Sequence, residues 1–245
     1  MGDTQKAAIV TGASRGIGRA LAVRLAREGF AVVVNYAGNQ AEAAKAVEEI
    51  ESAGGKAIAV QADVSKTADV ARLFDETEKA FGGVDVLVNN AGIMAMKPIA
   101  EFDDDTFDRI FAINVRGTFN TLKQAAKRIR SGGRIINFST SATPLTLPGY
   151  GPYGASKAAV EVFTAILTKE LRGRNVSVNT VAPGPVATEL FFDGKTAEQV
   201  ERLAKLNPFE RLGRPDDIAN VVAFLVGPEG AWVNGQTLRA NGGMV

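Results

Sequence analysis

Two residue types that carry much enzyme chemistry are missing from this sequence, whose 245 residues include no cysteine and no histidine. Without cysteine there are no disulfides, no thiol nucleophiles and no thiolate metal sites. Without histidine the commonest general base, the serine–histidine triads and most zinc sites are also excluded. Any acid–base chemistry must therefore use tyrosine, lysine or a carboxylate, and we expect no metal site.

The sequence also has little excess charge and no long apolar run. Its 28 basic and 27 acidic residues give a net charge of +1, so nothing indicates binding to nucleic acid or to an anionic membrane. No run of 18 apolar residues occurs, and Met1–Lys6 leads directly into a short apolar stretch. We therefore expect a cytoplasmic protein without a membrane span.

Short apolar runs alternate with helical patterns along most of the chain. Such alternation predicts a parallel sheet covered on both faces and joined by right-handed crossovers, in one α/β domain over residues 1–245. The expected strands are Lys6–Thr11, Ala31–Asn35, Lys56–Gln61, Asp85–Asn89, Arg134–Ser139, Val176–Val181 and Thr237–Ala240. The expected helices are Gly18–Gly29, Gln40–Ala53, Thr67–Phe81, Asp103–Arg130, Tyr153–Arg172 and Pro215–Val226.

The alternation lapses between Val186 and Arg214. An insertion at the carboxyl ends of parallel strands is typical of a lid over an active site, and this one contains the pair Phe191 and Phe192. We call residues 186–214 the lid segment. An ordinary surface excursion is the alternative.

Tyr153 and Lys157 lie four residues apart near the start of an expected helix. Residues at this spacing project from the same face, so an ammonium can sit beside a phenol that gives or takes a proton. Lowering the pKa of a tyrosine from about 10 to about 7 requires roughly 4 kcal/mol of preference for the anion. A close ammonium in a dry cleft, together with a cationic cofactor ring, can supply that preference.

A glycine-rich turn, Gly12 to Gly18, joins the first expected strand to the first expected helix. Glycines at this point let a pyrophosphate approach the helix N-terminus, where free amides favour anions. The second strand ends in Asn35-Tyr36-Ala37 with no carboxylate to hold the ribose hydroxyls of NAD, whereas Arg15 stands in the turn. This combination favours NADP over NAD.

The motifs together resemble the short-chain dehydrogenase/reductase family, in particular the 3-oxoacyl carrier-protein reductases and their ketoreductase relatives. The resemblance covers essentially the whole chain. It is carried by Thr11-Gly12-x-x-x-Gly16-Ile17-Gly18, Asp63-Val64, Asn89-Asn90-Ala91-Gly92, Asn114, Tyr153-x-x-x-Lys157, Pro183-Gly184 and Thr188. It implies a doubly wound Rossmann fold with a seven-stranded parallel sheet.

The resemblance also implies roles for four catalytic residues. Tyr153 would exchange a proton with the carbonyl or alcohol oxygen, Lys157 would hold the nicotinamide ribose, and Asn114 would position a water that links Lys157 to solvent. The family places a serine thirteen residues before the tyrosine, and Thr140 stands there instead, with the same hydroxyl donor. Ser141 and Ser139 remain competitors for that role.

The family pattern further predicts the residues that bind NADP(H). They are Gly12, Ser14, Arg15, Gly16, Ile17, Gly18, Asn35, Tyr36, Ala37, Asp63, Val64, Asn90, Ala91, Gly92, Tyr153, Lys157, Pro183, Gly184, Val186 and Thr188. Relatives are commonly tetramers that pair two long helices and a C-terminal surface, so a homotetramer is expected here as well.

We expect a reductase acting on an apolar ketone or 3-oxo compound. The expected pocket residues are Met94, Met96, Pro144, Leu145, Leu147, Leu190, Phe191 and Phe192. No cation is obviously placed to clamp a charged substrate, although Lys97 lies close to this rim in sequence. The alternative is a non-catalytic protein that senses NADP(H), which would not need Asn114, Tyr153 and Lys157.

Overall fold

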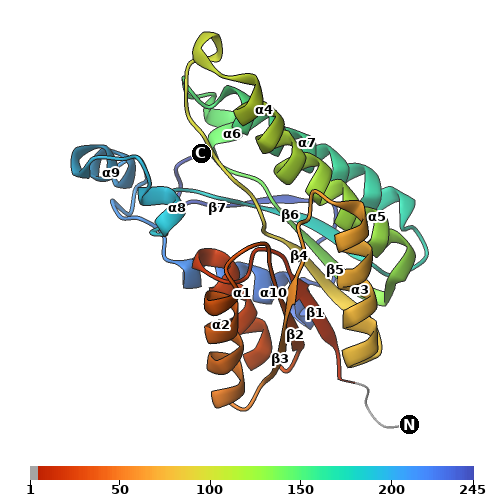
Figure 1. Ribbon diagram of the computed structural model, residues 1–245. Helices are drawn as coiled ribbons and strands as arrows, with labels where there is room; N and C mark the ends of the chain where they lie inside the picture. Colours follow the sequence, from red (N-terminus) through yellow and green to blue (C-terminus); the bar gives the residue numbers. More distant parts are fainter. Residues whose placement is uncertain (1–4) are drawn as a thin grey trace.

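A computed structural model describes residues 5–245 and shows a seven-stranded parallel sheet in the order β3-β2-β1-β4-β5-β6-β7 (Figure 1). The strands are β1 (Ala7–Val10), β2 (Ala31–Tyr36), β3 (Lys56–Gln61), β4 (Val84–Asn89), β5 (Ile129–Phe138), β6 (Ser177–Pro183) and β7 (Thr237–Ala240). All six strand pairs are parallel. The doubly wound Rossmann fold expected from the sequence is confirmed.

Side chains on the central strands alternate between two buried layers. Ala8 and Val10 pack into one core cluster and Ile9 into the other, and all three are fully buried. Because both faces of β1 are covered, each of its four positions is apolar and the strand shows no polar alternation. The continuous apolar run at the start of the chain is therefore typical of a strand buried on both faces.

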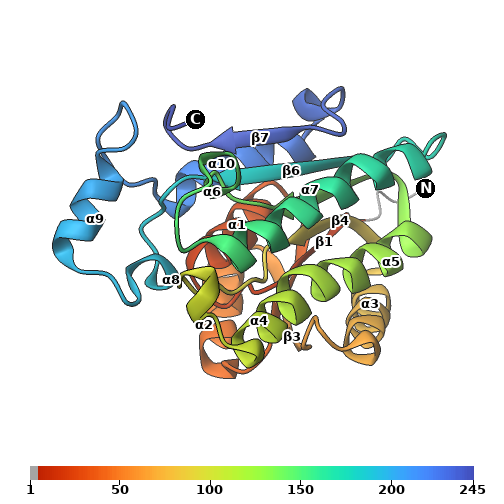
Figure 2. The same ribbon diagram turned by 90° about the horizontal axis from the view of Figure 1, so that it is seen from above.

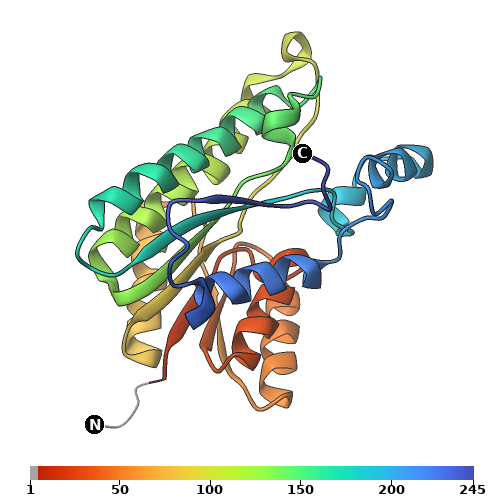
Figure 3. The same cartoon turned by 180° about the vertical axis from the view of Figure 1, so that it is seen from behind.

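Helices cover both faces of the sheet, as Figures 1 and 3 show from opposite sides. The first core cluster contains residues of α1 (Gly16–Arg27), α2 (Gln40–Ser52) and α10 (Pro215–Val226). The second contains residues of α3 (Thr67–Phe81), α5 (Thr118–Arg128) and α7 (Gly151–Glu170). Figure 2 shows α4 (Asp104–Ile110), α5 and α7 running along that second face. No helix of residues 5–245 is long and apolar enough to cross a membrane.

The long helix expected over Asp103–Arg130 differs from the observed structure. It consists of α4, a π-helical segment at Phe111–Gly117 and α5, and it ends at Arg128. Strand β5 begins at Ile129, five residues before its expected start, because Ile129 already pairs with Val84 across an irregularity in the ladder. Helix α7 begins at Gly151, so Tyr153 lies in its first turn.

The strand order reverses between β1 and β4, the neighbours at the centre of the sheet. Ligands bind in doubly wound folds at the carboxyl ends of strands beside such a reversal. The lid segment leaves the sheet after β6 and carries α8 (Glu189–Phe192) and α9 (Ala197–Ala204), which extend away from the sheet and its covering helices (Figures 1 and 2). Its two ends are tied together, since Ala187 donates to the Gly213 carbonyl at 2.9 Å and Gly213 to that of Pro185 at 2.9 Å.

Candidate active site

The glycine turn after β1 is shaped by close approaches that a side chain would block. Gly12 and Gly16 adopt φ angles of 62° and 55°, in the left-handed region that favours glycine. A Cβ added at Gly18 would lie 2.2 Å from the Gly12 carbonyl oxygen and 2.6 Å from the side-chain Nδ2 of Asn90. The turn therefore brings the start of α1 against the end of β4.

The N-terminus of α1 is open to an anion. No side chain caps it, and its first turn contains no acidic residue. The free amides of a helix N-terminus favour a phosphate. The turn is also held from the end of β4, the neighbouring strand in the sheet. There the Asn90 side chain donates to the Thr11 and Gly12 carbonyls at 2.9 and 3.1 Å. These features fit the pyrophosphate of a dinucleotide.

A groove of about 530 Å³ runs from this turn along the strand ends. It is lined by the following expected cofactor residues: Gly12, Ser14, Arg15, Gly16, Ile17, Gly18, Asn35, Tyr36, Ala37, Asp63, Val64, Asn90, Ala91, Gly92 and Thr188. Arg109 of α4 and Asn39 also line it, and neither was expected. Their contribution could not be inferred from a motif, since it depends on how α4 and the β2–α2 loop fold over the groove.

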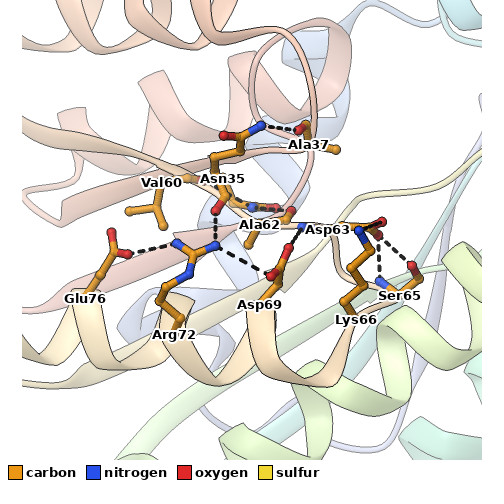
Figure 4. Close-up of polar contacts among 11 residues, drawn as sticks. Asn35, Ala37, Val60, Ala62, Asp63, Ser65, Lys66, Asp69, Arg72 and Glu76 are labelled. Atoms are coloured by element: carbon orange, nitrogen blue, oxygen red, sulfur yellow. Dashed lines mark hydrogen bonds and ion pairs between the residues drawn. The ribbon is translucent and has the colours of Figure 1, made fainter.

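The side chains of two expected cofactor residues form hydrogen bonds within the protein itself. Asn35 is 1% exposed; its side chain donates to the Val60 and Ala62 carbonyls at 3.2 and 3.0 Å and accepts from the Gly12 amide at 3.3 Å. One Asp63 carboxylate oxygen accepts from the Ser65 amide and hydroxyl at 3.0 and 2.7 Å (Figure 4). Both side chains thus shape the floor of the groove.

The β3–α3 turn beneath the groove is held by charged side chains. The Asp63 amide donates to Asp69 at 2.9 Å, and Arg72 donates to the Gln61 carbonyl at 2.7 Å and to Glu76 at 2.9 Å (Figure 4). The Asp69 carboxylate at the start of α3 is therefore engaged within the turn. The end of β2, where an acid would hold ribose hydroxyls, continues as Ala37-Gly38-Asn39 without a carboxylate.

Arg15 projects at the mouth of the groove and pairs with Glu189 of α8 at 2.7 Å. Their side chains are 62% and 74% exposed. An exposed pair of this kind contributes at most about 1 kcal/mol, so a phosphate can displace the carboxylate. The contact joins the glycine turn to the lid segment.

A second, smaller pocket of about 170 Å³ adjoins the groove and contains the acid–base residues. The lining includes Tyr153 and Lys157 of α7, Thr140 after β5, and four residues at and after the end of β6: Pro183, Gly184, Val186 and Thr188. The Lys157 Nζ lies 6.0 Å from the centre of the Tyr153 ring. The i, i+4 spacing read from the sequence therefore places phenol and ammonium in one pocket.

Lys157 is 6% exposed, and its Nζ donates to the Phe138 carbonyl at 2.9 Å. Burial lowers the pKa of Lys157 to about 8. Burial likewise raises the pKa of Tyr153 to about 12, with a smaller opposing effect from the hydrogen bond of the Thr140 side chain. The chain alone therefore keeps the phenol protonated, and Lys157 does not bring the tyrosine pKa toward 7 without a further positive charge.

The three hydroxyls after β5 have different surroundings. Ser139 donates to Glu161 at 2.6 Å, and Ser141 donates to the Ala182 carbonyl at 3.0 Å while accepting from Asn241 at 2.9 Å. Both serines are buried, at 4% and 1% exposure. Thr140 is only partly buried, its hydroxyl accepts from the Ala142 amide at 3.2 Å, and its side chain is close enough to Tyr153 to lower the pKa of that phenol. Geometry thus favours Thr140 over its two neighbours.

Asn114 lies behind the pocket and does not line it. Its side chain accepts from the Ile93 amide at 2.9 Å and donates to the Ile93 carbonyl at 2.9 Å and the Ser156 hydroxyl at 3.1 Å. The residue is fully buried in the π-helical segment. Asn114 thus ties the irregular segment after Gly92 to the helix that carries Tyr153 and Lys157.

The apolar wall of the pocket agrees only in part with the expectation. Met94, Leu145, Leu147, Leu190 and Phe191 line it, whereas Met96, Pro144 and Phe192 do not. Met96 and Phe192 are 37% and 45% exposed. Further lining comes from Ile93, Tyr150, Lys195, Leu203 and Met244, which the sequence pattern did not single out.

The expected absence of a cation needs correction. Lys97 pairs with Asp103 at 3.1 Å on the surface, with both side chains about half exposed at 49% and 48%. Lys195 of the lid segment instead lines the pocket. Its position depends on the path of the lid and left no signal in the sequence. Among the described residues 5–245, no cluster of acidic side chains suits a metal ion.

Comparison with known proteins places this site in a family. Residues 12–245 match the family model described as "Enoyl-(Acyl carrier protein) reductase". A short-chain type dehydrogenase/reductase of Picea abies is 49% identical over 98% of this chain and 92% of its own length. The chain belongs to the short-chain dehydrogenase/reductase family.

Other members of the short-chain dehydrogenase/reductase family carry more specific names. An "NADPH-dependent aldehyde reductase-like protein, chloroplastic" of Arabidopsis thaliana is 47% identical over 98% of this chain and 94% of its own. A short-chain dehydrogenase/reductase from Serratia marcescens superposes with a TM-score of 0.94 at 37% identity, covering 98% of both chains. The angucycline C-6 ketoreductase LanV with bound NADP gives 0.92 at 39% identity, covering 98% of this chain and 95% of the other.

Proposed function

We propose that this oxidoreductase reduces a carbonyl group on a largely apolar small molecule with NADPH. The observation that carries the proposal is the meeting of Thr140, Tyr153 and Lys157 in an apolar pocket that opens beside the glycine-turn groove. Relatives named as NADPH-dependent aldehyde reductases and ketoreductases support the same reaction class.

The cofactor is NADP(H). Its pyrophosphate fits the uncapped start of α1, and its 2′-phosphate is matched by Arg15 at the mouth of the groove. No carboxylate stands at the end of β2 to favour NAD. When bound, the nicotinamide supplies the hydride.

In reduction, Tyr153 donates the proton to the substrate oxygen. Its raised pKa means that the proton is present at neutral pH, and the Thr140 hydroxyl beside it shares the same oxygen through a second hydrogen bond. Two hydroxyls directed at one oxygen also suit a carbonyl better than a carbon–carbon double bond. The developing negative charge is therefore stabilised by donors that are already in place.

Lys157 stabilises the phenolate that remains after proton transfer. Its buried ammonium lies one helical turn from Tyr153, where low local dielectric strengthens their attraction. We infer that Lys157 also contacts the nicotinamide ribose, because a Cβ at Gly92 in the groove would lie only 3.3 Å from its Nζ. Asn114 acts as a positioning residue through Ile93 and Ser156. A water held near Asn114 that supplies Lys157 with protons remains a prediction.

The alternative of an NADP(H) sensor without turnover has less support. Binding alone requires the groove, whereas Thr140 and Tyr153 line a separate pocket with room for a second molecule.

A cytoplasmic location also remains a prediction.

A panel of aldehydes, ketones and 3-oxo thioesters, followed by consumption of NADPH or NADH, tests the proposal. We expect NADPH-dependent reduction of at least one carbonyl class, with NADH giving a lower kcat/KM. Tight NADPH binding without oxidation across the whole panel would support the sensor instead.

A further inference from the structure

A lysine of the lid segment, Lys195, lines the substrate pocket. Its Nζ is excluded from solvent and has no hydrogen-bond partner among the described residues 5–245. It lies 5.0 Å from the centre of the Phe191 ring, another residue of the pocket wall. An ammonium has three donors and is costly to bury without acceptors. The residue as a whole is only partly buried, and its long flexible stem allows the ammonium to turn toward an acceptor.

The backbone that carries Lys195 is fixed. Gly194 adopts a φ of 69°, and the Lys195 amide donates to the Phe192 carbonyl at 3.1 Å. The next residue, Thr196, begins α9 with a capping box, in which its side chain and that of Gln199 exchange bonds with backbone amides. The lysine therefore stands in an ordered turn between α8 and α9, which directs its side chain.

Neighbouring charges do not neutralise Lys195. Asp193 is near enough to favour the charged lysine, yet it lies outside ion-pair distance, and burial lowers the pKa of Lys195 despite it. The cofactor groove is lined by other residues and does not include Lys195. Lys195 thus stands on the wall of the space for the substrate, and that wall is otherwise mostly apolar.

We propose that Lys195 binds an anionic oxygen, such as a carboxylate, at the end of the substrate remote from the reacting carbonyl. The substrate class becomes a largely apolar aldehyde or ketone that carries one carboxylate. Thr140 and Tyr153 receive the carbonyl oxygen, and Lys195 of the lid segment receives the anion. This inference rests on the proposed reduction and corrects the expectation of an uncharged substrate.

Paired substrates that differ only in charge test the inference. 4-Carboxybenzaldehyde and methyl 4-formylbenzoate would be compared in the full-length protein and in Lys195→Met, with Lys97→Met as a matched control at the surface. We expect Lys195→Met to lower kcat/KM for the acid by about tenfold or more and to leave the ester within about twofold, since a charge-assisted hydrogen bond is lost only for the acid. The Lys97→Met variant should leave both values unchanged.

A binding measurement that needs no turnover keeps the inference separate from the proposed function. Calorimetry with 2-naphthoate and with 2-naphthylmethanol should show weaker binding of the naphthoate alone in Lys195→Met, by about tenfold. The Tm of this variant should equal or exceed that of the unmodified protein, because an unpaired buried charge has been removed. Equal losses for charged and neutral probes, no loss for either, or a clear fall in Tm would overturn the role of Lys195. Failure of every carbonyl to oxidise NADPH would instead contradict only the proposed reductase.

Discussion

The Lys157 ammonium lies 6.0 Å from the centre of the Tyr153 ring and donates to the Phe138 carbonyl at the end of β5. Burial acts on the two groups in opposite directions, lowering the pKa of the lysine to about 8 and raising that of the tyrosine to about 12. Each group is therefore pushed toward its neutral form. A positive charge in the groove would lower the pKa of Tyr153 and favour its phenolate. The protonation of Tyr153 would therefore depend on whether the cofactor is oxidised or reduced.

The first prediction concerns the pH dependence of stability without added nucleotide. Lys157 has a folded-state pKa of about 8 against an ordinary value of 10.5, so the unfolded chain binds more protons between these values. The free energy of unfolding contributed by Lys157 therefore rises with pH across that window, by an amount of the order of 3 kcal/mol. Tyr153 opposes it above pH 10, where the folded protein holds the proton longer than the unfolded chain.

Denaturant unfolding from pH 7 to 10 of the unmodified protein and of Lys157→Met measures this effect. The stability difference between the two should change in favour of the unmodified protein as the pH rises. A stability difference that does not change with pH would show that burial does not lower the pKa of Lys157.

A second prediction separates Thr140 from Ser141. Thr140→Val removes the hydroxyl beside Tyr153 with little change in volume, and we expect kcat to fall by about a hundredfold, as for the loss of an oxyanion donor. Thr140→Ser should retain most of the activity. Ser141→Ala instead removes partners of Asn241 and Ala182 and should cost about 1–2 kcal/mol of stability with much smaller effects on kcat. The opposite ranking of the two kcat values would assign the substrate hydroxyl to Ser141.

Cofactor preference gives a third prediction. Arg15→Ala should raise the KM for NADPH by about tenfold and change that for NADH little, since only NADPH carries the phosphate. Glu189→Gln should lower the KM for NADPH by a few-fold, because the competing 2.7 Å ion pair at Arg15 is exposed and weak. Steady-state kinetics with both cofactors measures these changes, and equal effects on NADH and NADPH would contradict the assignment of Arg15.

The glycine turn supplies a fourth prediction with a matched control. Gly18→Ala would place a methyl group 2.2 Å from the Gly12 carbonyl oxygen, so we expect a loss of NADPH binding measured by calorimetry. Gly154→Ala meets no atom within 4 Å and lies in helix α7, so it should stabilise the fold by about 0.5–1 kcal/mol with activity retained. Normal NADPH affinity in Gly18→Ala would contradict the described turn.

The exposed apolar residues lead to a fifth prediction. Phe119 of α5 and Val162 and Ile166 of α7 are 49%, 55% and 49% exposed, and Trp232 before β7 is 98% exposed. We expect these two surfaces to form the homotetramer anticipated from the family resemblance. Light scattering should give four times 25.8 kDa, and Val162→Glu should yield smaller species. A monomer in the unmodified protein would refute the tetramer.

The sequence allowed the fold and most of the pocket to be predicted because both depend on local patterns. Continuous apolar strands such as Ala31–Tyr36 fix a sheet buried on two faces, and a four-residue spacing brings Tyr153 and Lys157 together. Other features depend on long-range packing. The π-helical turn at Asn114 and the early start of β5 at Ile129 have no local signal.

Lys195 illustrates the same limit for the site. A lysine in a polar stretch such as Asp193-Gly194-Lys195-Thr196 is typical of solvent exposure, and only the path of the lid segment brings Lys195 to the wall of the pocket. Likewise Ser139 and Ser141 could not be separated from Thr140 until their hydrogen bonds to Glu161 and Ala182 were seen. These side-chain partners lie far apart in the sequence and favour Thr140, whose role stays a prediction.

The most direct test of the account is Tyr153→Phe, which removes the phenolic oxygen and keeps the ring. Hydride transfer from NADPH to a carbonyl substrate would be followed in a single turnover, with NADPH affinity measured in parallel. The account predicts that reduction slows by about a thousandfold or more while NADPH binds as before. Reduction at an undiminished rate in Tyr153→Phe would contradict the proposed proton donor.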